Sequence, residues 1–67
     1  MSEFLLVALK SYYQGGINVA RANIDVYLKN PAGIGEHPDI IGAIDEQVAA
    51  LAAADEKLET LNKYFPS

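Results

Sequence analysis

The stretch Asn30–Asp39, with the sequence NPAGIGEHPD, decides the fold of this 67-residue chain. It holds two of the three prolines and two of the five glycines, residues that end helices and form turns. The segments on either side have nearly uninterrupted helical patterns. We therefore predict an all-α fold with one domain at 1–67, an antiparallel helical hairpin. Two long helices, at about 3–29 and about 38–64, are joined by a corner at 30–37.

The segment before the corner carries two neighbouring apolar seams. Ser2 is the predicted N-cap, and Asn30 ends the helix because it precedes Pro31. Alternating steps of four and three residues give a first seam of Leu5, Leu9, Tyr12, Gly16, Val19, Asn23 and Val26. A second seam, one residue over, contains Leu6, Tyr13, Ile17, Ala20, Ile24 and Tyr27. Two seams are more than a single partner helix can cover.

Gly15 and Gly16 lie in the middle of this helix, where each glycine costs about 1 kcal/mol relative to alanine. Three explanations stay open: a kink, the close approach of another helix at Gly16, or a ligand that approaches the backbone. Asn23 is a polar residue on an otherwise apolar seam. A buried polar pair that fixes the register of two helices would explain it.

The segment after the corner carries one strict heptad seam. Pro38 is the predicted first helical residue, with His37 as the N-cap. The seam contains Ile40, Ile44, Gln47, Leu51, Ala54, Leu58, Leu61 and Phe65. Ile41 and Val48 widen the apolar stripe in the first half of the helix, which is therefore expected to carry an additional contact with another molecule.

An antiparallel hairpin with a short corner fixes which residues face each other. Their numbers should add to about 68–70. Gly16 then lies opposite the alanine-rich stretch 49–54, which favours close approach over a kink. The same register brings Asn23 level with Gln47, so the two amides are predicted to form a hydrogen-bonded layer.

The length and composition favour self-association. Without a disulfide, a bound metal or a partner, a single core in a chain of this size stabilises it by only about 3–5 kcal/mol. The chain has no cysteine and 51% hydrophobic residues, so disulfides are excluded and one hairpin cannot cover its apolar surface. We predict a four-helix bundle or a higher homo-oligomer. The residues expected to pack within the hairpin or between copies are Tyr12, Tyr13, Gly16, Ile17, Asn23, Ile24, Tyr27, Ile41, Gln47, Val48 and Ala54.

The chain is acidic, with a net charge of −4. Electrostatic attraction to nucleic acids and to anionic membranes is therefore not expected. The apolar run at 4–9 is too short to span a bilayer and has no basic leader, so a cytoplasmic location is expected.

The corner has some features of a chemical site. Gly33 and Gly35 resemble a small nest of backbone amides ahead of a helix, and together with Lys10 they are the possible anion contacts. The acidic side chains nearby and the lack of a phosphate-loop lysine favour a purely structural turn. The spacing of Glu36, His37 and Asp39 around a proline does not suit a metal site, so no metal, cofactor or catalytic residue is predicted. Ile34, Glu36 and His37 are the possible contact residues of the exposed corner.

Three segments carry a resemblance to a known group of proteins. They are Ser11–Gly15 (SYYQG), Asn23–Leu28 (NIDVYL) and the corner Asn30–Asp39. Together they resemble short uncharacterised proteins encoded by tailed bacteriophages of marine bacteria. The resemblance implies a context only: a viral product in the cytoplasm of an infected bacterium, where such proteins assemble with themselves or bind a host component.

The sequence therefore predicts a non-enzymatic accessory protein that self-associates and acts through protein–protein interaction, with itself and a host protein as partners. The alternative is an oligomeric protein that binds or sequesters a small anion or nucleotide at a subunit interface. Neither nucleic acid nor a membrane is an expected partner.

Overall fold

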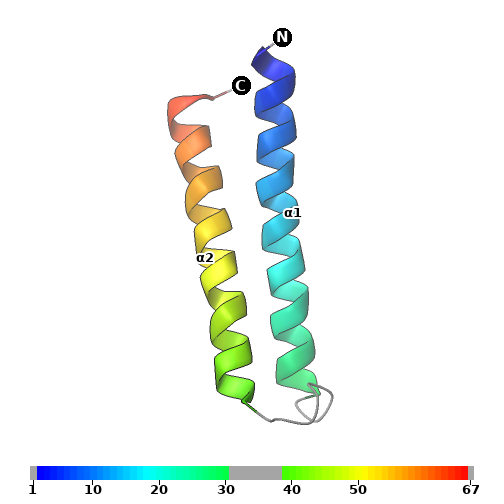
Figure 1. Cartoon of the computed structure of the whole chain (residues 1–67). Coiled ribbons are helices and arrows are strands. Elements are labelled where there is room, and N and C mark those ends of the chain that lie inside the picture. Colours follow the sequence, from blue (N-terminus) through cyan, green and yellow to red (C-terminus); the bar gives the residue numbers. More distant parts are fainter. Residues whose placement is uncertain (1, 31–38, 67) are drawn as a thin grey trace.

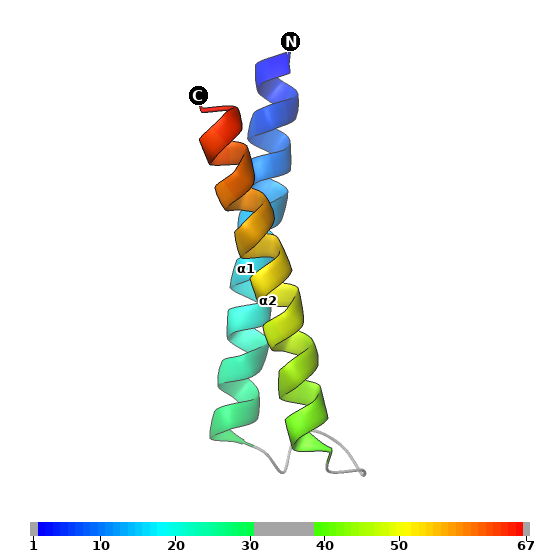
Figure 2. The same ribbon diagram turned by 90° about the vertical axis from the view of Figure 1, so that its left-hand side faces the viewer.

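The computed structural model describes residues 2–30 and 39–66 and confirms the all-α hairpin. Helix α1 spans Ser2–Lys29 and helix α2 spans Ile40–Tyr64. They lie side by side and antiparallel, with both chain ends at the same end of the molecule (Figure 1). The molecule is a rod of 47 × 16 × 15 Å, and the two helices cross at a shallow angle (Figure 2).

Local hydrogen bonds define the two helix ends next to the corner. The Asn30 N–H donates to the Val26 carbonyl over 2.8 Å. At the other side Asp39 is the N-cap of α2, and its Oδ1 accepts from the Gly42 N–H over 2.9 Å. The prediction that α2 begins at Pro38 with His37 as the cap is therefore corrected: the helix begins at Ile40. Aspartate is among the strongest N-cap residues, because its carboxylate accepts from the free N–H groups of the first turn.

The second α1 seam packs against the α2 heptad seam. Ile17 and Ala20 are the buried apolar residues among those described, with 8% and 2% of their surface exposed. The remaining members of the second α1 seam and the α2 seam from Ile40 to Leu61 are partly buried. Phe65 is 54% exposed, because α2 ends at Tyr64 and the seam ends with it. The core is thus a single thin line of side chains.

The observed register follows the predicted pairing. A Cβ added at Gly16 would lie 3.6 Å from the Ala54 Cβ, an ordinary van der Waals distance. Asn23 Nδ2 donates to Gln47 Oε1 over 3.1 Å, the predicted amide pair. The residue numbers add to 70 in both pairs. α1 continues through Gly15 and Gly16 as one helix, so the two glycines coincide with close packing and not with a helix end.

Candidate functional site

One face of the hairpin contains an apolar groove between the two helices, with a volume of ≈ 610 Å³. Its floor is made of small residues, because the helices approach each other closely where Gly16 meets Ala54. The residues that line it include Tyr12, Gly16 and Val19 from α1 and Ala50, Ala53 and Ala54 from α2. We call this side of the molecule the groove face.

Aromatic and cationic side chains border the groove near its middle. The Lys57 Nζ lies 5.7 Å from the centre of the Tyr13 ring, a distance typical of a cation–π contact. The Tyr12 and Tyr13 ring centres are 5.8 Å apart with a tilt of 58°. Both tyrosines were predicted packing residues. Tyr13 is partly buried within the hairpin, whereas Tyr12 is 74% exposed.

The first α1 seam forms an exposed apolar stripe along the groove face. Leu5 is 75% exposed, Val19 61% and Val26 56%. These residues share a helix face with Tyr12 and Gly16, since they follow the same steps of four and three residues. We call Leu5, Leu9, Tyr12, Gly16, Val19, Asn23 and Val26 the α1 stripe. Within one hairpin, α2 leaves most of this stripe uncovered.

The opposite face is more polar. Its shallow hollow, of ≈ 500 Å³, is lined by Arg21 and Asp25 together with Leu28 and Leu51. Lys29, farther along the same helix, donates from its Nζ to Asp25 Oδ2 over 3.0 Å. Charged side chains therefore interrupt the apolar surface on this side.

Ile41 and Val48 are exposed on α2, with 79% and 46% of their surface accessible. Helical spacing places them on the same side of α2 as Leu51, away from the groove face. They are apolar and available, as the sequence suggests, but the α1 stripe is longer. The greater part of the uncovered apolar surface in the described helices therefore lies on α1.

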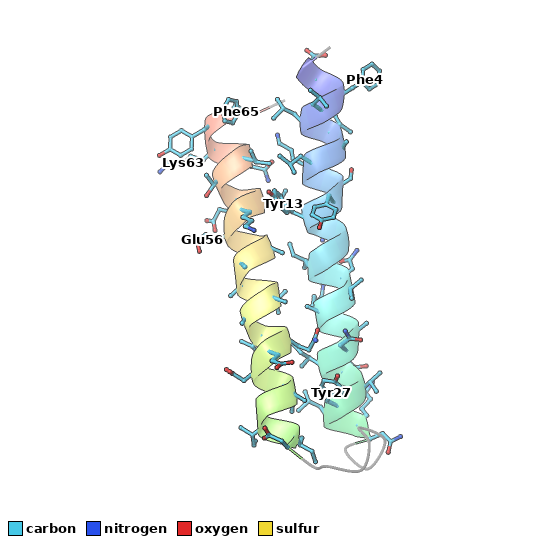
Figure 3. The ribbon with its side chains drawn as sticks, in the orientation of Figure 1. Phe4, Tyr13, Tyr27, Glu56, Lys63 and Phe65 are labelled. Atoms are coloured by element: carbon cyan, nitrogen blue, oxygen red, sulfur yellow. The ribbon has the colours of Figure 1, made fainter. Side chains whose placement is uncertain are left out.

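The side of α2 that faces away from α1 carries charged residues. Figure 3 shows Glu56 and Lys63 directed away from α1, whereas Phe4 projects from the far side of α1. Phe4 is 82% exposed and lies outside the α1 stripe. Glu56 and Lys63 therefore do not line the groove.

The predicted packing residues come together only in part. Ile17 is buried, and Ile24 and Tyr27 are partly buried against α2. The corner residues Ile34, Glu36 and His37 lie outside the described part of the chain, as do the possible anion contacts Gly33 and Gly35.

Lys10, the third possible anion contact, lies far from the corner. It precedes Lys29 by 19 residues on α1, which corresponds to about 28 Å along the helix axis. Its Nζ instead donates to the Phe65 carbonyl over 2.7 Å, at the end of the molecule where the chain ends meet. In the sequence, Lys10 occupies the gap between Leu6 and Tyr13 in the second seam. That gap was the signal that could have revealed its contact with α2.

Within residues 2–30 and 39–66, no group of three or more histidine, aspartate or glutamate side chains is arranged to hold a metal ion. Neither described helix combines the length and hydropathy needed to cross a membrane. Of the two hollows described, the groove is the more apolar. Comparisons with protein-family models, with curated proteins and with solved structures find no match to this chain.

Proposed function

We propose that the chain is a non-enzymatic protein that associates with itself through the groove face and acts by protein–protein interaction. Two hairpins would form a four-helix bundle in which each covers the other's groove. The observation that carries the proposal is the amount of surface that a single hairpin leaves exposed.

The hairpin exposes 5211 Å² of surface. A compact monomer of 7.2 kDa exposes about 4,100 Å², so the excess is roughly 1,100 Å². The radius of gyration shows the same elongation: it is 14.9 Å, against about 11 Å for a compact domain of this length. A single hairpin is too thin to bury the usual share of its surface.

A dimer would remove this excess. A compact protein of twice the mass exposes about 6,800 Å², whereas two separate hairpins expose twice 5211 Å². The difference of about 3,600 Å² falls within the range of permanent subunit interfaces, about 2,000–5,000 Å². A dimer as compact as a typical globular protein would therefore bury an area typical of an obligate dimer.

The phage resemblance supports a role inside an infected bacterium, with a host component as the further partner. In this proposal the cytoplasm of the host is the location. The dimer supplies the folded scaffold, and surfaces outside the groove face remain available for the host component.

A second candidate function is suggested by the groove itself. Its volume of ≈ 610 Å³ is that of a small-molecule site, and Lys57 beside Tyr13 could hold an anionic or aromatic ligand such as a nucleotide. A thermal-shift screen with nucleotides tests it. A ligand at about 100 times its dissociation constant should add about 2.7 kcal/mol to the free energy of unfolding.

Light scattering coupled to size exclusion tests the main proposal. At micromolar concentration we expect a mass of about twice 7.2 kDa, together with a melting temperature that rises with protein concentration. A helical, cooperatively folded monomer whose melting temperature is independent of concentration would contradict self-association.

A further inference from the structure

We infer that the second copy docks with its own α1 against α1, antiparallel, and that the two helices cross at Gly16. The Lys29 ends of the two α1 helices then lie at opposite ends of the dimer. This inference rests on the proposed self-association and adds the surface and the orientation.

The α1 stripe has the symmetry that such a contact needs. In a two-fold interface, residue i contacts residue j of the partner and j contacts i. With the crossing at Gly16, facing residue numbers add to 31 or 32. Leu5 then faces the second copy's Val26, and Tyr12 faces its Val19. Leu9 faces its Asn23, whose amide is already bonded to Gln47. The other apolar residues of the α1 stripe meet apolar residues, and Gly16 meets itself.

The sizes of the side chains also fit a crossing at this point. Neighbouring helices of a four-helix bundle cross at a shallow angle of about 20°, so they stay within side-chain reach along their length and are closest at the crossing, where side chains must be smallest. Gly16, at the crossing, has no side chain. Tyr12 and Val19 follow on either side, and Leu5 and Val26 lie toward the ends. All four of these larger residues are exposed in the single hairpin.

The helix dipoles favour the antiparallel orientation. An antiparallel crossing brings the positive N-terminal end of one α1 beside the negative C-terminal end of the other, whereas a parallel crossing brings like ends together. The charged side chains Glu3 and Lys29 take no part in this contact, because helical spacing places them away from the α1 stripe and Lys29 is bonded to Asp25.

Cysteine cross-linking tests the surface and the orientation together, because the natural chain has no cysteine. The variant Leu5→Cys/Val26→Cys places two thiols 21 residues apart on one helix, about 31 Å, so they cannot bond within one chain. On mild oxidation we expect most of it to become a covalent dimer on a non-reducing gel. Each single variant should remain without a cross-link, since equal positions lie far apart in the antiparallel dimer.

The matched control is Val7→Cys/Asp25→Cys. Its residue numbers add to 32, so its register is nearly the same, but helical spacing places both residues on the opposite face of α1. It should form no covalent dimer. Circular dichroism should show unchanged helix content in both double variants, because the replaced residues are exposed in the hairpin.

The outcomes separate this inference from the proposed function. A dimer by light scattering without the Leu5–Val26 cross-link overturns the α1 surface and leaves self-association intact. Cross-linking of the single Leu5→Cys variant indicates a parallel arrangement and overturns the orientation. A folded monomer under the same conditions overturns both.

Discussion

At the scale of single residues, the amide pair formed by Asn23 and Gln47 does most to fix how the helices face each other. Both side chains are partly buried, and the 3.1 Å hydrogen bond satisfies one donor and one acceptor. A shift of either helix by one turn would leave each amide facing an apolar neighbour, which costs more than the bond contributes. The pair therefore selects one register.

Replacing one amide should be worse than replacing both. We expect Asn23→Leu or Gln47→Leu alone to lower the free energy of unfolding by about 1–3 kcal/mol, because the remaining partner loses its hydrogen bond. The double variant should lose less than either single variant. Urea unfolding of the two singles and the double at one protein concentration measures this, and purely additive losses would show that the pair is not coupled.

The glycines differ in what an added methyl group meets. At Gly15 a Cβ meets nothing within 4 Å, so Gly15→Ala should raise the free energy of unfolding by about 1 kcal/mol. At Gly42 a Cβ would overlap the Asp39 carboxylate. Displacing that cap costs about as much as alanine contributes, so Gly42→Ala should give no gain. Equal stabilisation of both variants in urea unfolding would contradict the capping contact.

At the scale of the helices, the bounds of α1 and the seam of α2 followed from Pro31 and from the heptad spacing. The start of α2 did not, because His37 and Asp39 are both placed to cap a helix near Pro38. Which of the two residues caps α2 depends on which side chain reaches the free N–H groups of the first turn. Backbone geometry decides this, and the spacing of residues in the sequence does not reveal it. In the structure the Asp39 carboxylate reaches Gly42.

This cap gives α2 a testable dependence on Asp39. Asp39→Ala should lower the free energy of unfolding by about 0.5–2 kcal/mol, because the Gly42 N–H loses its acceptor. Asp39→Asn is the matched control and should be nearly neutral, since asparagine caps equally well. Thermal melts followed by circular dichroism provide the comparison. If alanine and asparagine destabilise equally, the negative charge matters and the hydrogen bond does not.

At the scale of the whole molecule, the sequence predicted two apolar seams on α1 but not which of them faces α2. Both have the same spacing, so periodicity cannot separate them. The structure turns the second seam inward, where Ile17 fills the space beside α2, and leaves the α1 stripe outside with Gly16 at its inner edge. The predicted corner contacts lie outside the described residues, so the candidate site rests on the α1 stripe.

A pair of lysine substitutions tests whether the α1 stripe is the dimer interface, without disturbing the hairpin. Val19 on the α1 stripe is 61% exposed and Leu28 on the opposite face is 65% exposed. Val19→Lys should weaken dimerisation by at least about tenfold, because burying a valine is worth about 1.5 kcal/mol or more. Leu28→Lys should leave it unchanged. Sedimentation equilibrium measures both, and equal weakening would place the interface elsewhere.

The constant sum of facing residue numbers also determines how the hairpin opens. Contacts near the corner, such as Asn23 with Gln47, close a separation of 24 residues, whereas Lys10 with Phe65 closes one of 55. Breaking the contact of Lys10 with Phe65 leaves the contacts nearer the corner in place. The two helices therefore begin to separate at the end of the molecule that holds Lys10 and Phe65. Amide hydrogens near Lys10 and Leu61 should therefore exchange with solvent sooner than those near Ile24 and Gln47. The most persistent helical structure would then lie in the turns of α1 and α2 around Ile24 and Gln47.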